Sequence, residues 1–241
     1  MDLGLRDRRA AVAAASGGLG FAAAASLARE GARVVVCGRD RGRIDDAAER
    51  VGHGCVGVVA DVGTADGATA FVEQATDVLG GLDIVVPNAG GPPAGTFEST
   101  PPEEYLPALE LNLMSVVTMC RAAVPAMRRQ GWGRVVAITS LAVRQPMVNL
   151  ILSNTARAGA TAFLKTLARE VAADGVTVNS VQPGLHHTAR VKALYGDGEV
   201  PGPMGDPADF GEIVTFLCSE QARFVTGTAL HVDGGAYLGL M

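Results

Sequence analysis

The sequence predicts an α/β fold of three layers, in which a doubly wound parallel sheet of about seven strands carries helices on both faces. Short apolar runs rich in valine and alanine alternate with longer segments of helical period along the 241 residues. The apolar runs are hydrophobic on both faces, as parallel strands covered by helices are. No internal repeat or low-complexity linker interrupts this alternation, so we expect residues 1–241 to form a single domain.

Each predicted strand is a short apolar run, and each predicted helix is a longer amphipathic segment. The strands are expected at residues 10–15, 33–37, 55–59, 84–86, 134–139, 177–181 and 229–232. The helices are expected at residues 19–30, 42–51, 66–79, 102–130, 150–173 and 207–219, several opened by Pro or Asp. Right-handed crossovers between parallel strands place the ligand cleft beyond the carboxyl ends of the strands. Functional residues are therefore expected just after the strands.

The composition argues against several classes of protein. The formal net charge is −5 and no basic run occurs, which disfavours a nucleic-acid surface. No stretch reaches the roughly 18 apolar residues of a membrane span, and early charges disfavour an export signal, so we expect a cytoplasmic protein without membrane contact. The cysteines lack metal-ligand spacing, so no metal site is expected and they are interpreted as small buried hydrophobes: Cys37, Cys55, Cys120 and Cys218.

A glycine-rich turn follows the first predicted strand and leads into an alanine-rich helix. In this context the turn presents backbone N–H groups and a helix N-terminus to a pyrophosphate. The alternative is a tight strand–helix connection that binds nothing. As a dinucleotide site, the turn would use Ala14, Ser16, Gly17, Gly18, Leu19 and Gly20.

The end of the second strand indicates which dinucleotide is bound. An acidic residue there would accept hydrogen bonds from the adenosine ribose of NAD, whereas a guanidinium pairs with the additional phosphate of NADP. Here Gly38 is followed by Arg39, with Arg41 and Arg43 nearby. Solvated loop arginines are the alternative, but the position of Arg39 at the strand end favours NADP(H).

The remaining motifs follow in an order that resembles the short-chain dehydrogenase/reductase family. They are an Asp-Val pair, an Asn-Ala-Gly turn, a helical Asn, a Ser after the fifth strand and a Pro-Gly turn, at Asp61-Val62, Asn88-Ala89-Gly90, Asn112, Ser140 and Pro183-Gly184. The match runs from about residue 8 to Gly235 and ends in Thr226-Gly227 and Val232-Asp233-Gly234-Gly235. The chain resembles the 3-oxoacyl carrier-protein reductases of that family, which implies a Rossmann-type fold around an NADP(H) site.

The resemblance also implies which further residues contact the cofactor. By this resemblance, Asp61 and Val62 contact the adenine. The wall of the cofactor cleft would be formed by Asn88, Ala89 and Gly90. The nicotinamide would be covered by Pro183, Gly184 and Thr188. Two positions depart from the family pattern: Ala14 stands where its first glycine usually sits, and Pro87 where an Asn often precedes Asn88. Because Ala14 still supplies an N–H group, cofactor binding should survive.

The catalytic positions depart further. In the family a serine positions the carbonyl oxygen, a tyrosine transfers the proton, a lysine lowers the tyrosine pKa and holds the nicotinamide ribose, and an asparagine completes a proton path through water. Ser140 and Asn112 match the serine and the asparagine. Counting on from Ser140, the tyrosine position falls on Ser153 and the lysine position on Arg157, four residues apart on one helix face. A serine hydroxyl is far less acidic than a phenol, and Arg157 can hold the ribose but cannot carry a proton near neutral pH.

Several other groups could compensate for the absent phenol. Arg144, four residues after Ser140, could stabilise a developing alkoxide, with a solvated loop arginine as the equal alternative. His186 and His187 could donate a proton near pH 7, although loop histidines without such a role are commoner. Water relayed through Asn112 is the remaining proton source.

These observations favour an NADPH-dependent reductase or dehydrogenase of a small carbonyl or alcohol substrate, similar to the ketoreductases of secondary metabolism, with an atypical proton source. Residues 189–206, which contain several Gly and Pro, would form the substrate lid. The alternatives are a non-catalytic NADP(H)-binding subunit or sensor, and non-redox chemistry in a reused pocket. By the resemblance we also expect a homo-oligomer, a tetramer, packed through small helix residues such as Ala156, Ala158, Gly159 and Ala160.

Overall fold

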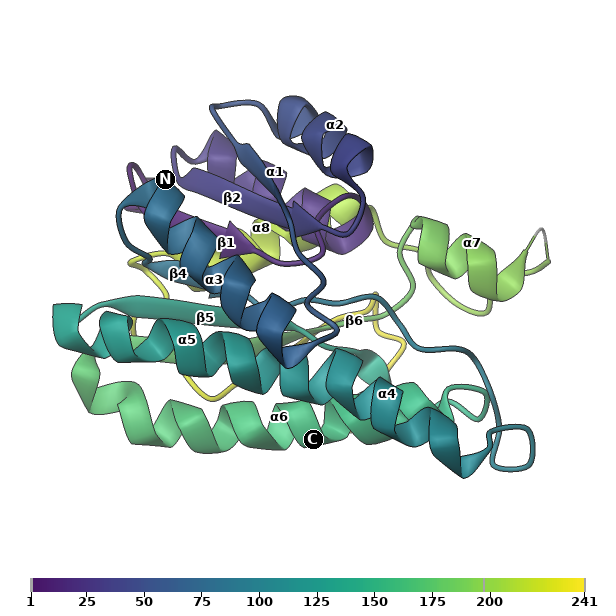
Figure 1. Ribbon diagram of the computed structural model, residues 1–241. Helices are drawn as coiled ribbons and strands as arrows, with labels where there is room; N and C mark the ends of the chain where they lie inside the picture. Colours follow the sequence, from purple (N-terminus) through teal and green to yellow (C-terminus); the bar gives the residue numbers. More distant parts are fainter. Residues whose placement is uncertain (1, 197, 241) are drawn as a thin grey trace.

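The computed structural model, which describes residues 2–196 and 198–240, contains a seven-stranded sheet flanked by helices (Figure 1). The strand order is β3-β2-β1-β4-β5-β6-β7, and each neighbouring pair is parallel. The strand order reverses between β1 and β4, which is where doubly wound sheets bind ligands. The predicted fold class is therefore confirmed. The strands are Arg9–Val12 (β1), Arg33–Gly38 (β2), Val56–Val59 (β3), Ile84–Val86 (β4), Gly133–Ile138 (β5), Val176–Pro183 (β6) and Ala229–Val232 (β7).

Helices cover both faces of this sheet. One face packs against α3, α5 and α6, and the other against α1, α2 and α8. Short 3-10 turns are η1 (Pro102–Glu104), η3 (Leu141–Val143) and η4 (Ala172–Asp174). The helices are Gly18–Arg29 (α1), Arg41–Val51 (α2), Ala65–Leu79 (α3), Tyr105–Leu109 (α4), Ser115–Gln130 (α5), Ile151–Val171 (α6), Ala189–Tyr195 (α7) and Pro207–Cys218 (α8).

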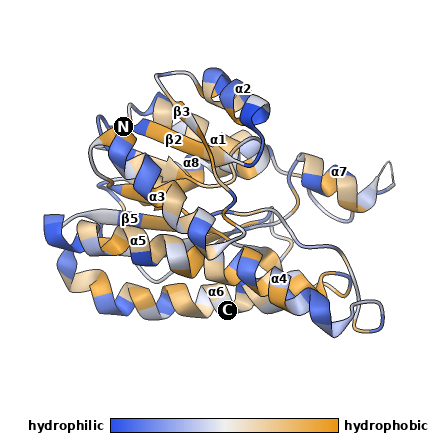
Figure 2. Ribbon diagram, in the orientation of Figure 1, coloured by the Kyte–Doolittle hydropathy of each residue, from blue (hydrophilic) through white to orange (hydrophobic). Residues whose placement is uncertain are grey.

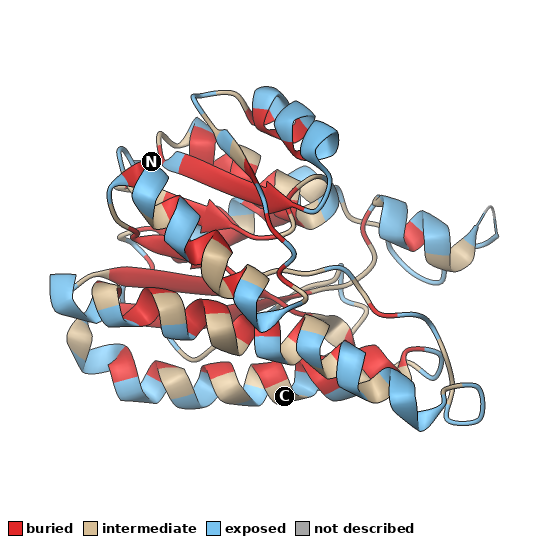
Figure 3. Ribbon diagram, viewed as in Figure 1, coloured by how far each residue is buried: buried red, intermediate tan, exposed pale blue. Residues whose placement is uncertain are grey.

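The two-sided core explains why the strand sequences are apolar throughout. In β5, Val135 and Ala137 contribute to one hydrophobic cluster while Val136 and Ile138 contribute to the other. Figure 2 shows hydrophobic residues along the strands, and Figure 3 shows the same strands buried between helices whose outer surfaces are exposed. Burying one such aliphatic side chain contributes about 1.5–3 kcal/mol, so both faces hold the sheet in place.

The segment predicted as one helix over residues 102–130 is divided in the structure. A π-helical turn, η2 (Glu110–Met114), separates α4 from α5, and the Ser115 N–H donates to the Glu110 carbonyl across it. The extra residue in this turn changes which side chains face the sheet, and Asn112 becomes only 2% exposed. Periodicity alone does not reveal such an insertion, since the apolar pattern continues on both sides.

Residues 186–205 form an excursion from the sheet that contains α7, which projects from the body of the molecule (Figure 1). Its two ends are tied together, because the His187 N–H donates to the Gly205 carbonyl at 3.0 Å and the Gly205 N–H donates to Leu185 at 2.9 Å. The sequence does not predict α7. Most of the excursion matches the segment expected to form a substrate lid.

Most of the small residues expected on an oligomer interface are engaged within the chain. Ala156 and Ala160 are fully buried, and a side chain at Gly159 would approach Leu113 to 3.3 Å. Ala158 alone of the four is exposed. The expectation is therefore corrected for Ala156 and Ala160, which pack within their own chain, whereas packing of Ala158 and Gly159 against a partner stays a prediction.

Two smaller expectations can be compared with the described residues. Cys37, Cys120 and Cys218 are buried, as predicted, and burial raises the pKa of each thiol to about 12. The expectation is wrong for Cys55, which is partly exposed because it directly precedes the edge strand β3. Across residues 2–196 and 198–240, none of the helices has the length and apolar character needed to cross a bilayer.

Candidate active site

A cavity of about 1120 Å³ lies at the carboxyl ends of β1 to β6. It exceeds the range of about 300–1,000 Å³ typical for drug-sized ligands. The structure brings nearly all the predicted site residues to its wall, although they come from the ends of six strands and from helix α6. Those at the wall are Ala14, Ser16, Gly17, Gly18, Leu19, Gly20, Arg39, Asp61, Val62, Asn88, Ala89, Gly90, Ser140, Ser153, Arg157, Pro183, Gly184 and Thr188.

The glycine turn after β1 is held by a cross-strand side chain. The Asn88 amide donates to the carbonyls of Ala13 and Ala14 at 3.1 and 3.3 Å, which ties the end of β4 to this turn. A Cβ at Gly20 would lie 2.7 Å from that amide nitrogen and 3.0 Å from the Ala14 oxygen. Glycine is therefore required at position 20 by close packing, because any side chain there would displace Asn88.

Backbone conformation explains the other glycine preference in this turn. Gly18 has φ +60° and Ala14 has φ +48°, both in the left-handed region that L-residues with a side chain rarely adopt. Ala14 ends the extended conformation after Val12, so β1 is shorter than predicted. The position at which the family usually has glycine thus carries a strained alanine.

The start of α1 is open toward the cavity. Its N-cap residue, Gly17, offers no side-chain hydrogen bond, and a Cβ at Gly17 would meet no atom within 4 Å. The first N–H groups of the helix consequently remain available to an anionic ligand. Thr188 lies beside this turn, with its Cγ2 atom 3.7 Å from the position of a Cβ at Gly18.

The loops after β2 and β3 place charged residues at one end of the cavity. Arg39 is exposed and lines the cavity together with Arg43. Asp40 is occupied as the N-cap of α2, where its carboxylate accepts the Arg43 N–H at 2.8 Å. Asp61 accepts the N–H of Gly63 at 3.0 Å. Neither Arg39 nor Arg43 forms an ion pair with any described residue, so both guanidinium groups are available to an anionic ligand.

Asn112 supports the cavity wall from behind. Its amide nitrogen donates to the Gly90 carbonyl at 2.8 Å, while its amide oxygen is buried and has no partner among the described residues. The side chain is not among those that line the cavity. Asn112 therefore positions the segment from Asn88 to Gly90 through this hydrogen bond.

Two serine hydroxyls face the cavity from neighbouring elements. Ser140 follows β5 by two residues and caps the 3-10 turn η3, because its Oγ accepts the Ala142 N–H at 3.1 Å. That contact fixes the oxygen and leaves the hydroxyl proton free to donate. Ser153, in the first turn of α6, is 6% exposed, and its hydroxyl has no hydrogen-bond partner within residues 2–196 and 198–240.

Arg157 is a buried cation that joins two strand ends. Its guanidinium donates to Ile138 and Thr139 at 3.0 and 3.3 Å and more weakly to Ala89 and Gly90 at 3.4 and 3.5 Å. Burial, together with the positive charge of nearby Arg190, lowers its pKa to about 10. Arg157 therefore stays protonated at neutral pH, without an ion pair in the described part of the chain.

The lid contributes residues that the sequence motifs did not identify. Arg190, in the first turn of α7, crosses to the β4 loop and donates to the Pro92 carbonyl at 2.7 Å. The only sequence signal for it is an arginine just beyond Thr188 in the loop expected to cover the cofactor. Of the two histidines proposed as proton donors, His186 lines the cavity and His187 is exposed outside it. Burial lowers the pKa of His186, which makes it a neutral imidazole at pH 7.

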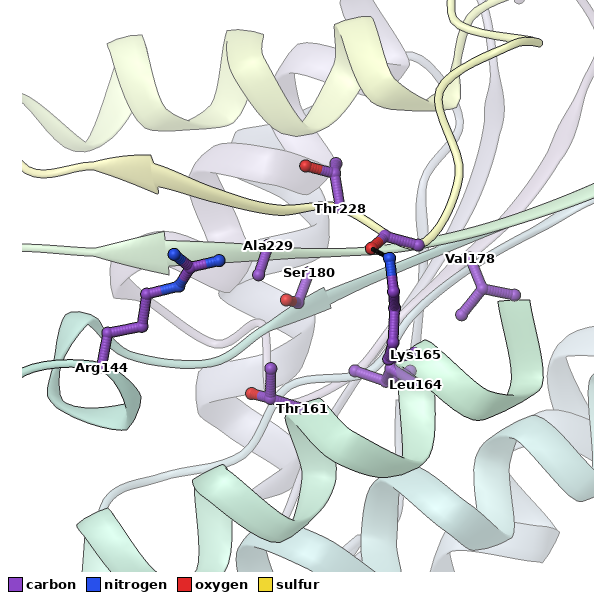
Figure 4. Close-up of a pocket in the computed structure, with 9 residues that line it drawn as sticks. Arg144, Thr161, Leu164, Lys165, Val178, Ser180, Thr228 and Ala229 are labelled. Carbon is purple, nitrogen blue, oxygen red and sulfur yellow. Dashed lines mark hydrogen bonds between the residues drawn. The ribbon is translucent and has the colours of Figure 1, made fainter. Parts of the chain in front are cut away.

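The expectation that Arg144 faces the substrate does not fit the structure. Arg144 follows the single turn of η3, where its N–H donates to the Leu141 carbonyl at 3.0 Å, and this turn reverses the chain direction. Its side chain lines a different, smaller pocket beside Ser180 and Ala229 (Figure 4). Sequence separation from Ser140 suggested proximity, but the turn sends the two side chains to different pockets.

Comparisons with known proteins agree with this geometry. The family model described as Enoyl-(Acyl carrier protein) reductase matches residues 13–237. Dehydrogenase/reductase SDR family member 4 of Homo sapiens is 34% identical, over 96% of this chain and 88% of its own length. The 3-oxoacyl-(acyl-carrier-protein) reductase FabG of Vibrio cholerae is 33% identical, over 98% of this chain and 100% of its own length.

A solved structure gives the same result for the whole fold. L-Sorbose reductase from Gluconobacter frateurii, complexed with NADPH and L-sorbose, superposes with a TM-score of 0.93 at 32% identity and covers 100% of both chains. The family model spans most of the chain, and the relatives exceed 30% identity over nearly all of it. The chain belongs to the short-chain dehydrogenase/reductase family.

Proposed function

We propose that this protein is an NADPH-dependent reductase, or in reverse a dehydrogenase, of a small carbonyl or alcohol substrate. The observation that carries the proposal is the single cavity that holds the glycine turn, Arg39 and the Ser140 hydroxyl together. Its relatives include 3-oxoacyl-(acyl-carrier-protein) reductases and an L-sorbose reductase crystallised with NADPH, which supports an NADP-dependent oxidoreductase. Within that class, we favour a ketoreductase of the kind found in secondary metabolism.

The residues at the cavity fit NADP(H). The turn stays tight because Gly20 has no Cβ, which would meet Asn88 and Ala14. The open N-terminus of α1 offers hydrogen-bond donors to a pyrophosphate. The Arg39 guanidinium, with Arg43 beside it, suits the additional phosphate by charge and by its forked donors. Asp40, the acidic residue next to Arg39, already accepts the Arg43 N–H as the N-cap of α2.

The proposed chemistry assigns a distinct task to each nearby side chain. Bound NADPH supplies a hydride to the substrate carbonyl carbon. Ser140 donates a hydrogen bond to the carbonyl oxygen from a position fixed by the Ala142 N–H. Arg157 places positive charge at the ends of β4 and β5, which favours negative charge on the substrate oxygen.

The proton source is the atypical part of this proposal. By the family resemblance, Ser153 and Arg157 occupy the positions of the usual tyrosine and lysine. The free Ser153 hydroxyl can bind substrate or a water molecule, but it is a poor acid. We propose that water delivers the proton, while Ser153 orients it and Arg157 contributes charge alone.

A non-catalytic NADP(H)-binding subunit or sensor is the second candidate. It is favoured by the structural engagement of Arg157 and Asn112, since both bond main-chain carbonyls of the cavity wall. Non-redox chemistry in the same pocket is a third reading, because a fold does not determine a reaction. We further propose that the chain is one domain and assembles as a homo-oligomer, a tetramer, which light scattering at micromolar concentration tests.

The deciding experiment combines binding and turnover. NADPH and NADH are titrated by calorimetry into wild type, Arg39→Ala and Arg41→Ala, and carbonyl compounds are then screened anaerobically by NADPH absorbance. Arg41 is the matched control, because it pairs with Asp45 at 3.6 Å and does not line the cavity. Loss of a charged phosphate contact should weaken NADPH binding at least about tenfold in Arg39→Ala only.

The outcomes separate the candidates. Turnover of a carbonyl compound supports the reductase, whereas tight NADPH binding without turnover supports the sensor or the non-redox reading. Equal affinity of wild type for both cofactors, or unchanged selectivity in Arg39→Ala, would contradict the assignment of Arg39.

A further inference from the structure

A second pocket, of about 200 Å³, lies between α6 and the β6–β7 edge of the sheet (Figure 4). It shares no lining residue with the large cavity, so it is a separate site. Its volume is below the roughly 300–1,000 Å³ that organic ligands of drug size occupy. Any ligand that it encloses must be small.

Two cations line this pocket and no carboxylate does. Arg144 and Lys165 approach it from opposite sides (Figure 4), and neither forms an ion pair with any described residue. The Lys165 ammonium donates one hydrogen bond to the Gly227 carbonyl at 2.8 Å, which leaves two of its three donors unused. Unpaired positive charge around a small pocket favours an anion.

A buried hydroxyl between the two cations points to the same kind of ligand. Ser180 is only 2% exposed and lines the pocket, and its hydroxyl has no partner among the described residues. Because this hydroxyl opens into the pocket, its proton is available to a ligand that accepts a hydrogen bond there. The Thr161 proton is already donated to the Arg157 carbonyl at 2.9 Å, and the Thr228 side chain points away from both cations (Figure 4), so Ser180 supplies the free hydroxyl.

We propose that this pocket binds a small oxyanion of the size of inorganic phosphate. Arg144 and Lys165 supply charge-assisted hydrogen bonds from two sides, and the Ser180 hydroxyl completes the donor set from the sheet. The site is distinct from the cavity that holds Arg39. Arg144 thus acts at this pocket and not at the substrate carbonyl.

The test uses inorganic phosphate as the probe, titrated by calorimetry into the cofactor-free full chain at constant ionic strength. Arg144→Gln and Lys165→Met should each weaken binding at this site by about tenfold or more, because each removes a charged donor. Ser180→Ala should weaken it severalfold. Arg169→Gln is the matched control, since Arg169 is exposed on α6 one turn beyond Lys165 and does not line the pocket.

Arg39→Ala separates this site from phosphate bound in the large cavity. Phosphate binding that survives Arg39→Ala and is lost in Arg144→Gln supports the proposal. Binding that is unchanged in both Arg144→Gln and Lys165→Met overturns it, as does the absence of any binding in wild type tighter than about 10 mM. Circular dichroism of each variant establishes folding, and Ser180→Ala, which removes a single oxygen, provides the test if a cation variant is unstable.

Discussion

Replacing Gly20 by alanine should destabilise the protein through one defined contact. The new methyl group would lie 2.7 Å from the Asn88 amide nitrogen and 3.0 Å from the Ala14 carbonyl oxygen. These atoms belong to the hydrogen bonds, of 3.1 and 3.3 Å, by which Asn88 joins the end of β4 to the glycine turn. The methyl group must therefore push Asn88 away from both carbonyls.

The size of the effect follows from those two bonds. Leaving a buried polar group without its partner costs about 1–3 kcal/mol. The better helix propensity of alanine offsets at most about 1 kcal/mol of this loss. From the midpoint of this loss, with and without the full offset, we expect the free energy of unfolding to fall by about 1–2 kcal/mol, which in a chain of this length lowers Tm by roughly 2–8 °C.

The assay is thermal and urea unfolding of Gly20→Ala beside the matched variant Gly17→Ala. Gly17 has φ 176°, an extended conformation open to any residue, and a Cβ there would meet nothing within 4 Å. Gly17→Ala should therefore fold with nearly wild-type stability but bind NADPH more weakly, because its methyl group enters the cavity. Gly20→Ala thus tests the packing of the turn against Asn88, and Gly17→Ala tests the access of NADPH to the cavity.

A double variant tests the mechanism. In Asn88→Ala the amide is already absent, so adding Gly20→Ala should lower the free energy of unfolding less than it does in wild type. The difference between the two losses, which is the interaction energy, should be at least about 0.5 kcal/mol. Full additivity, or equal destabilisation by Gly17→Ala and Gly20→Ala, would refute the reasoning.

Three further predictions concern other contacts. Ala14→Gly should raise the free energy of unfolding by about 0.5–1 kcal/mol in urea titrations, because it relieves the φ of +48°, and a loss of stability would contradict this. Ser140→Ala should reduce kcat/KM by about 100- to 1000-fold, and Ser153→Ala should stay within about tenfold of wild type; the reverse order would assign the proton relay to Ser153. Burial would raise the pKa of Asp83, but hydrogen bonds from Arg9 hold it below its usual value. The ionised Asp83 therefore stabilises the folded protein at neutral pH, and this stabilisation is lost as the pH falls below about 4. Unfolding free energies measured from about pH 5 to 2 should fall less steeply in Asp83→Asn, and identical slopes would exclude this linkage.

Residues that follow strands could be located from the sequence because the fold itself brings them together. Once alternating strands and helices predict a parallel sheet, all strand carboxyl ends meet at one edge. Arg39, Asn88, Ser140 and Thr188 come from four different strand ends, and the structure brings them to one cavity. Their roles in binding and catalysis remain predictions, which the variants above address.

Side-chain direction was harder to predict. Arg144 was expected to face the substrate because it lies four residues after Ser140, but η3 turns the chain and directs it to the smaller pocket. Asn112 was expected in the site, and the π-helical turn places it behind the wall, bonded to Gly90. In each case one irregular turn changed the direction of a side chain without changing the pattern of apolar residues.

The sequence by itself determined the fold class, the position of the ligand edge and the family resemblance, because these depend on periodicity and on motifs placed after strands. Only the tertiary structure decided that the Ser153 hydroxyl is unpartnered, that Arg157 bonds four carbonyls from two strand ends and that Arg190 crosses the cavity to Pro92. Hydrogen-bond partners distant in the chain are selected by packing in three dimensions. These partners therefore cannot be predicted from the neighbouring residues in the sequence.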